Sequence, residues 1–253
     1  MGEYTVASAE KAGRGTIITL HLKEDAAEFL EEARLRNIVK TYSDHIAIPI
    51  LLAKGEDEED ALNEASALWT RQKSEITEEQ YTEFYRHVSH GFDTPWLTTH
   101  WRAEGRFEYN ALLFTPSSRP FDLFHPERKH RVKLYVKRVF ITDDYEGLVP
   151  KWMRFLRGII DTPDVDLNVS REMLQQNPAV TKISKAVVKR VLSELKKALD
   201  KRRDEYATFW EGLGKVLKEG LYEDQANSEK LLEICLFRST KTDKLITLQD
   251  YID

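Results

Sequence analysis

The chain has 253 residues, of which 41% are hydrophobic and 32% charged, and its formal net charge is -5. This near balance of charges gives no reason to expect nucleic-acid binding, because neutralising phosphates requires a clear basic surplus. No apolar run approaches the ~18 residues that would span a membrane. The single cysteine, Cys235, excludes an internal disulfide and a thiolate-rich metal site, and it favours a reducing compartment such as the cytosol.

The N-terminal part of the chain predicts a strand, a helix and a second strand. Residues 16–22 alternate in polarity as a half-buried strand does. Residues 24–43 have apolar positions at the helical period, with acids in the first turn, where the helix dipole favours them. Pro49 cannot donate to a ladder, so the β-rich run 46–52 predicts an edge strand. The acidic stretch 53–65 has few large apolar residues and predicts a short linker.

The middle of the chain predicts a helix and three strands. Thr77 and Gln80 have capping-box spacing at the start of a helix that Gly91 would end. Residues 98–116 predict two strands joined by a Glu-Gly turn. Residues 131–142 predict one further strand, with basic residues on both of its faces.

The remainder of the chain predicts mostly helices. Pro150 favours a helix start, and an apolar stripe follows it at Trp152, Phe155, Leu156 and Ile159. A long amphipathic helix is predicted from Pro178, then two shorter helices over about 203–218 and 223–238, and a strand or turn at the end. Strands mixed with helices and followed by a helical segment predict an α/β or α+β fold.

Three histidines raise the question of a metal site. His87 and His90 lie near each other on a predicted helix, and His100 follows them. Zinc sites usually add a cysteine or carboxylate at a defined spacing, and no HExxH motif is present. We therefore favour ordinary packed or polar histidines and expect no metal. Cys235 lies in an apolar helical run and is predicted to be a small buried hydrophobic residue.

Basic and aromatic residues offer two candidate binding surfaces. The basic run at 125–140 has aromatic residues between its charges, as a nucleic-acid surface does, but the acids downstream and the net charge favour a solvated loop and strand. Tryptophan is frequent in binding hot spots. Trp152 is predicted to lie in the core, whereas Trp69 and Trp210 are the better candidates for exposed contact residues.

Residues 166–177, DLNVSREMLQQN, place charge and amide groups at a predicted helix start. With Ser170 as the N-cap, Arg171 and Gln175 lie one turn apart on one helix face. A guanidinium fixed in this way suits a phosphate, which it can contact through two parallel hydrogen bonds. The alternative is an ordinary helix-starting arginine that pairs with a nearby acid.

Several long motifs, in one order along the chain, resemble the middle domain of the ninety-kilodalton heat-shock chaperones. They are LWTRQKSEITEEQYTEFY, KLYVKRVFITDD, RGIIDTPDVDLN and LNVSREMLQQN. The residues before these motifs are similar to the last strand and helix of that family's N-terminal ATP-binding domain. The short acidic linker resembles the bacterial members. The resemblance covers essentially the whole chain.

The resemblance implies an α/β fold. A layered α/β lobe similar to the second domain of ribosomal protein S5 would be followed by connecting helices and the start of a truncated small α/β lobe. The implied parts are the end of the ATP-binding domain at 1–52, the linker at 53–65, the large lobe at 66–200, and the helical connection with the start of the small lobe at 201–253.

The resemblance also implies that the chain is part of an ATP-dependent molecular chaperone of the cytoplasm. Arg171 would reach the γ-phosphate of ATP as an arginine finger, and Gln175 would assist. The ATP and its Mg²⁺ would be held by the N-terminal domain, so this chain alone is expected to be inactive. Phe140 would contact that domain, and Trp69 and Trp210 would contact client proteins.

The implied partners are unfolded or partly folded client proteins, the protein's own N-terminal ATPase domain, a DnaK-type chaperone, and a second copy bound through a C-terminal dimerisation domain. Neither a nucleic acid nor a membrane is an expected partner. The alternative is a passive protein-interaction module, in which the arginine pairs internally and makes no catalytic contribution.

Overall fold

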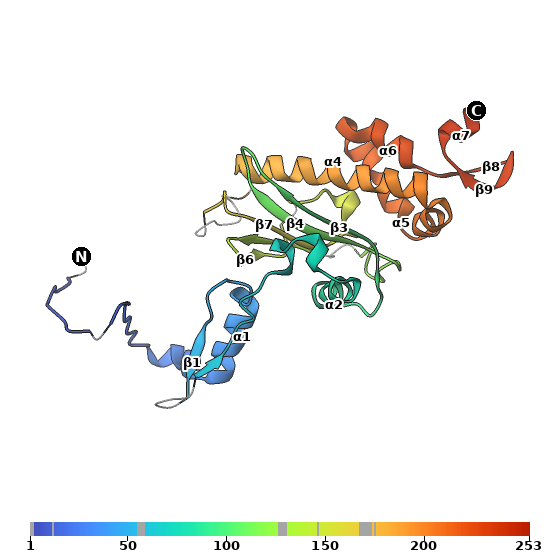
Figure 1. Ribbon diagram of the computed structural model, residues 1–253. Helices are drawn as coiled ribbons and strands as arrows, with labels where there is room; N and C mark the ends of the chain where they lie inside the picture. Colours follow the sequence, from blue (N-terminus) through green and yellow to red (C-terminus); the bar gives the residue numbers. More distant parts are fainter. Residues whose placement is uncertain are drawn as a thin grey trace. The chain divides into compact units, whose positions relative to one another are not determined.

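The computed structural model describes residues 3–11, 13–54, 59–125, 131–145, 147–166, 174 and 176–253 (Figure 1). The chain divides into two compact units, residues 1–37 and residues 38–253. Among the described residues, the second unit contains the large sheet and all of the buried hydrophobic side chains, so it carries the candidate site.

The first unit has helical structure only toward its end. A 3₁₀ helix, η1 (Glu24–Leu30), is followed by the start of α1 (Glu32–Tyr42). Within α1, the Nη2 atom of Arg36 lies 2.6 Å from the carboxylate of Glu32, one turn away. These two elements confirm the helix predicted over 24–43, with a short break between them.

The strand predicted over 16–22 is wrong. These residues have no β structure, and Ile17, Ile18 and Leu20 are exposed. A strand needs a neighbour to satisfy its backbone N–H and C=O groups, and no strand of the described chain lies within this unit. An alternating pattern alone therefore does not produce a ladder.

The segment after α1 forms a small hairpin. β1 (Leu51–Ala53) pairs antiparallel with β2 (Glu59–Ala61). The strand predicted over 46–52 therefore begins only near the end of that run. The stretch 53–65, predicted to be a linker, contains the partner strand.

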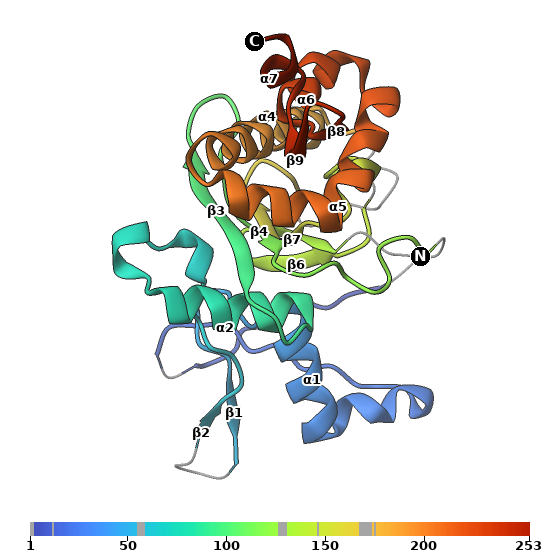
Figure 2. The same ribbon diagram turned by 90° about the vertical axis from the view of Figure 1, so that its right-hand side faces the viewer.

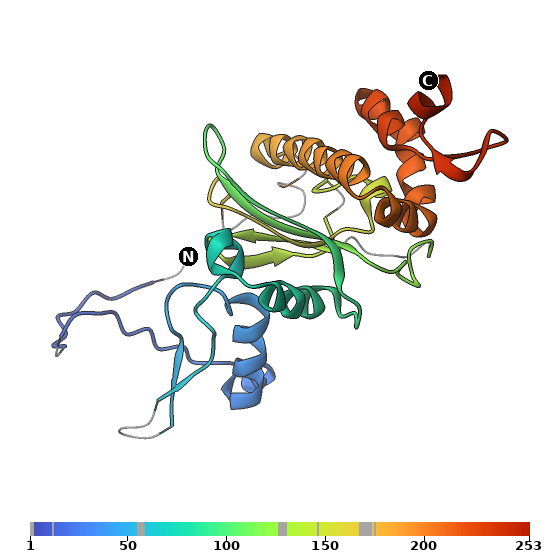
Figure 3. The same ribbon diagram turned by 45° about the vertical axis from the view of Figure 1, so that its right-hand side comes forward.

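A five-stranded mixed sheet is the centre of the second unit. Its strand order is β3-β4-β7-β5-β6, and every neighbouring pair is antiparallel except β5 with β7. α2 covers one face of the sheet, and α4 and α5 lie over the other (Figure 2, Figure 3). The bounds are β3 (Pro95–Ala103), β4 (Tyr109–Pro116), β5 (Val132–Val136), β6 (Val139–Thr142), β7 (Arg157–Thr162), α2 (Glu78–Ser89), α4 (Pro178–Lys201) and α5 (Arg203–Glu223).

Alternate side chains of β4 belong to two separate cores. Leu112 and Phe114 pack with Tyr85 of α2, whereas Ala111 and Leu113 join the larger cluster formed with α4 and α5. This is the period-two alternation of a strand with both faces covered. The mixed sheet and its helices confirm the predicted α/β fold class.

α2 begins as its capping box predicts. The backbone N–H of Gln80 donates to Oγ1 of Thr77 at 3.3 Å, and the backbone N–H of Thr77 donates to Oε1 of Gln80 at 3.1 Å. The helix ends at Ser89, two residues before the predicted glycine. His90 is its C-cap, in the left-handed conformation with φ of 55°, so Gly91 is not needed for that turn.

The single strand predicted over 131–142 is wrong, because β5 and β6 form a hairpin there. Its turn residues, Lys137 and Arg138, have φ of 51° and 65°. A two-residue turn of this type usually contains Asn, Asp or Gly, which accept positive φ. The sequence therefore carries no turn signal at this position.

The helix predicted from Pro150 is also wrong. Only a 3₁₀ turn, η4 (Lys151–Met153), follows the proline, and the chain then enters β7. Ile159 and Ile160 are both buried, on opposite faces of the sheet. An apolar run of this kind suits an interior strand and cannot be distinguished from a buried helix by periodicity alone.

The C-terminal part contains the predicted helices, although the one predicted over about 223–238 ends at Ile234, and it adds a further hairpin. The end of the chain is folded as η5 (Gln225–Asn227), α6 (Ser228–Ile234), β8 (Phe237–Ser239), β9 (Thr242–Ile246) and α7 (Leu248–Ile252). Cys235 is buried as predicted, and burial raises the pKa of its thiol to about 11. Among the described residues, no helix has the length and apolar character needed to cross a bilayer.

Candidate functional site

The predicted phosphate-contacting residues, Arg171 and Gln175, lie outside the described residues. Phe140, predicted to contact a neighbouring domain, lies on β6 and is partly buried. Its ring centroid is 5.6 Å from that of Tyr135 and 5.9 Å from that of Tyr42. Part of the ring remains accessible, and its interdomain role stays a prediction.

Trp69 and Trp210 are both buried, so the prediction that these side chains are exposed is wrong. Trp69, on the 3₁₀ turn η2 (Leu68–Thr70), is 0% exposed, and Trp210, on α5, is 6% exposed. Trp152 is buried as predicted. Contact with clients at Trp69 or Trp210 stays a prediction, but their burial speaks against it because binding requires an accessible side chain.

The buried carboxylate of Asp161 joins Trp69 to the turn between β5 and β6. Its Oδ2 accepts a hydrogen bond from Nε1 of Trp69 at 2.9 Å, and its Oδ1 accepts one from the backbone N–H of Arg138 at 3.1 Å. Each left-handed residue of that turn costs about 1–2 kcal/mol. The hydrogen bond from Arg138 offsets part of this cost. A tertiary contact therefore stabilises the hairpin that carries Phe140.

We expect Asp161→Asn to destabilise the second unit by about 2 kcal/mol, because the new amide places an N–H group opposite one of the two N–H donors, that of Trp69 or that of Arg138. Urea unfolding followed by tryptophan fluorescence measures this loss. Asp166→Asn, at an exposed aspartate, is the matched control and should change stability by less than about 0.5 kcal/mol. Equal stability of the two variants would contradict the assignment.

His100 has a structural role, in which it joins Trp69 to Tyr81 of α2. Its Nε2 lies 3.0 Å from the backbone oxygen of Trp69, so Nε2 carries the hydrogen, and its Nδ1 accepts from the hydroxyl of Tyr81 at 2.7 Å. Burial lowers the pKa of His100, which favours this neutral tautomer. Within the part of the chain that the structure describes, no three His, Cys, Asp or Glu side chains are grouped to hold a metal ion.

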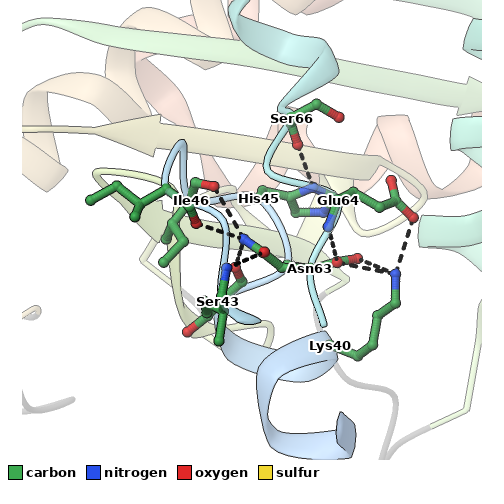
Figure 4. A network of polar contacts seen from close by, with 10 residues as sticks. Lys40, Ser43, His45, Ile46, Asn63, Glu64 and Ser66 are labelled. Atoms are coloured by element: carbon green, nitrogen blue, oxygen red, sulfur yellow. Dashed lines mark hydrogen bonds and ion pairs between the residues drawn. The ribbon is translucent and has the colours of Figure 1, made fainter. Parts of the chain in front are cut away.

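Asn63 organises the chain between α1 and η2. Its Oδ1 accepts from the backbone N–H of Ile50 at 2.8 Å, and its side chain lies beside Ser43 and Ile46 (Figure 4). Its Nδ2 lies within 3.4 Å of three backbone oxygens, those of Ser43, Ile46 and Ile48. One buried amide thus satisfies backbone groups that no strand or helix pairs.

Asp44 and His45 hold the same segment against Trp69 and Tyr135. Oδ1 of Asp44 accepts from the backbone N–H of Glu64 at 3.0 Å. Nδ1 of His45 lies 2.9 Å from the backbone oxygen of Ser66 (Figure 4). The ring of His45 meets that of Trp69 edge-on, with centroids 4.7 Å apart. Burial lowers the pKa of His45. The neutral His45 ring therefore holds this segment in place through its contacts with Ser66 and Trp69.

The two most exposed large hydrophobic side chains among the described residues line one groove. Phe92 is 98% exposed and Phe121 is 101% exposed, and the groove between their loops has a volume of about 870 Å³. We call it the phenylalanine groove. Its walls also include Tyr85, His90, Asp93, Arg119, Arg131 and Arg157.

Polar contacts hold the two loops of the phenylalanine groove together. Oδ1 of Asp93 accepts from the hydroxyl of Tyr85 at 2.8 Å, and its Oδ2 accepts from Oγ of Ser118 at 3.0 Å. Burial raises the pKa of Tyr85, so its hydroxyl remains a donor. The exposed rings therefore project from anchored backbone, and the groove is open to an apolar partner.

Sequence reasoning missed Phe92 and Phe121 and selected tryptophans instead. Both phenylalanines stand between a turn-forming residue and an aspartate, in the triplets Gly-Phe-Asp and Pro-Phe-Asp. Turn chemistry on both sides places such a residue on a loop rather than in a packed element. That context was the available signal of exposure.

Residues 52–253 match the family model of the Hsp90 protein. The chain is 58% identical over 251 residues to the chaperone protein HtpG of Paramagnetospirillum magneticum, an alignment that covers 99% of this chain and 40% of that relative. The HtpG of Rhodospirillum rubrum is 57% identical over 251 residues, with the same coverage. The HtpG of Rickettsia bellii is 54% identical over 253 residues, covering 99% of this chain and 41% of the relative.

The chain therefore spans about 40% of the length of these curated relatives. The matched region includes the whole five-stranded sheet, the phenylalanine groove and the hairpin that carries Phe140. The family model matches four-fifths of the chain, and more than half of the residues along nearly all of it are identical to those of a relative. Together these matches establish the family of the chain. The chain belongs to the Hsp90 protein family.

Proposed function

We propose that the chain is part of an ATP-dependent molecular chaperone and that it contacts client proteins through the phenylalanine groove. The observation that carries this proposal is the exposure of Phe92 and Phe121 at one open groove. Exposed aromatic rings on a fixed backbone are typical of protein-binding sites. The relatives' name, chaperone protein, supports unfolded polypeptide as the partner.

The groove suits an extended apolar segment with an acidic flank. Burying an exposed phenylalanine contributes about 1.5–3 kcal/mol, so two rings supply enough for weak, reversible binding. The exposed guanidinium of Arg119 lies in the groove wall and favours a carboxylate beside the apolar segment. Asp122, the acid nearest to Phe121, is already engaged with Arg131 at 3.4 Å.

We expect Phe121→Ser to weaken binding of an unfolded protein by about tenfold, because one hot-spot ring is lost. The probe is reduced, carboxymethylated α-lactalbumin with a fluorescent label, and the readout is fluorescence anisotropy with the 253-residue chain. Tyr222→Ser is the matched control, since Tyr222 is an aromatic residue on α5 that is 88% exposed and does not line the groove. Equal affinity of the two variants would refute the groove as the client site.

The ATP-dependent part of the proposal concerns Arg171 and Gln175. In the full-length protein, an N-terminal domain would hold ATP with Mg²⁺, and Arg171 would contact the γ-phosphate after the two domains dock, with Gln175 assisting. Phe140, partly accessible on β6, would contact that domain. The residue pattern and the resemblance support these roles. A homodimer, a DnaK-type partner and a cytoplasmic location belong to the same proposal.

A further inference from the structure

The loop that presents Phe121 and Phe124 depends on a buried anchor. Leu123 is fully buried between these two residues, and its backbone N–H donates to the oxygen of Pro120 at 3.1 Å. The backbone N–H of His125 donates to the oxygen of Asp122 at 3.0 Å. A solvent-exposed ring cannot fix its own position. The conformation of this short backbone therefore determines where the ring of Phe121, which lines the groove, points.

Arg154 contacts this loop directly. Its Nε donates to the backbone oxygen of Leu123 at 2.9 Å, and its guanidinium carbon lies 5.7 Å from the ring centroid of Phe124. Its Nη1 donates to the oxygen of Lys151 at 3.0 Å. Both Nη atoms donate to the carboxylate of Glu219 on α5, with Nη2 2.7 Å from Oε1. One planar guanidinium thus connects the loop, η4 and α5.

The two elements that carry Arg154 and Glu219, η4 and α5, pack closely against each other. Gly220 follows Glu219 on α5, and a Cβ atom at Gly220 would lie 2.7 Å from the ring of Trp152. Trp152 belongs to η4, the 3₁₀ turn that Arg154 caps at its C-terminal end. The indole ring of Trp152, two residues before Arg154, therefore packs directly on the α5 backbone beside Glu219. The ion pair is only partly exposed, with side chains 19% and 34% accessible, so water screens it less than a surface pair.

We infer that Arg154 is a positioning residue of the phenylalanine groove, which it holds in its client-binding shape through the bidentate pair with Glu219. The inference rests on the proposed function. Because α5 continues toward α6 and the β8–β9 hairpin, Arg154 also makes the groove sensitive to the position of that helix. A purely structural cross-link would contribute to stability without changing the position of Phe121 at the groove.

Glu219→Gln tests the inference with the smallest change in shape, since it removes the charge and one acceptor from the bidentate pair. We expect the affinity for labelled, carboxymethylated α-lactalbumin to fall about fivefold, near the lower end of typical coupling effects. The amides of Leu123 and His125 should exchange hydrogen faster, while the exchange of β4 and β7 stays unchanged. Arg154→Lys retains the charge but loses the planar donor set, and it should give the same two changes.

Asp250→Asn is the matched control, because it breaks another ion pair of α5, that of Arg203 with Asp250. It should change neither the affinity nor the exchange of the loop amides. If the unaltered chain does not bind the probe, the proposed function fails and the inference fails with it. If the unaltered chain binds and both variants match it, only the positioning role is overturned. A loss of affinity that accompanies faster exchange throughout the sheet would also overturn it.

Discussion

Gly158→Ala is expected to destabilise the second unit by about 4 kcal/mol, enough to unfold much of it at ordinary temperature. Gly158 lies in β7 with φ of 125°, a conformation that L side chains rarely adopt. A Cβ atom there would overlap the backbone oxygen of Leu112 on the neighbouring strand β4. Neither strand can move aside, because β4 is hydrogen-bonded to β3 and β7 to β5.

Gly105→Ala separates the two contributions to this loss. Gly105 also has a strongly positive φ, 146°, but nothing lies within 4 Å of its added Cβ. It should therefore lose only the conformational term, about 1–2 kcal/mol. Urea unfolding of the two variants, followed by circular dichroism, measures the difference. Equal stabilities would show that the approach of Leu112 is not a close contact in solution.

Arg171→Ala is expected to reduce ATP hydrolysis by the full-length protein by at least about 10³-fold, the lower range of an arginine-finger effect. A guanidinium that contacts the γ-phosphate mainly in the transition state changes turnover more than nucleotide binding. We therefore expect the dissociation constant for ATP and the thermal unfolding temperature to remain close to those of the unaltered protein. Steady-state phosphate release and equilibrium nucleotide titration measure these quantities.

Arg203→Ala is the matched control for Arg171→Ala, because Arg203 is a partly exposed arginine at a helix start that pairs with Asp250. It should leave turnover unchanged. Turnover of Arg171→Ala within about twofold of the unaltered protein would exclude the finger role, since even the smallest such effect is far larger. The chain would then be better described as a passive interaction module.

Most of the helices were predictable because their signals are local, although the apolar stripe after Pro150 predicted a helix where β7 lies. The capping box at Thr77 and the apolar period after Pro178 involve residues within a few turns of one another. The strands and turns that were missed depend on distant residues. The turn at Lys137 and Arg138 has no favourable turn residue, and Asp161, far along the chain, supplies the compensating hydrogen bond.

Whether an aromatic side chain is exposed also depends on distant residues and not on local signals. Trp69 is buried because Asp161 satisfies its indole N–H and His45 packs on its ring. Phe121 is exposed because Leu123, two residues later, takes the buried position in that loop. Hydrophobicity ranks both aromatic residues as core candidates, and only the path of the backbone decides which of them reaches the core.

The sequence by itself determined the α/β class, the long amphipathic helices and the resemblance to the heat-shock chaperones, because these depend on local pattern and ordered motifs. Tertiary structure alone decided that β7 is an interior strand, that Trp69 and Trp210 are buried, and that Phe92 and Phe121 line an open groove. The physical reason is that strand pairing and burial are set by contacts between residues far apart in the chain, which a one-dimensional pattern does not contain.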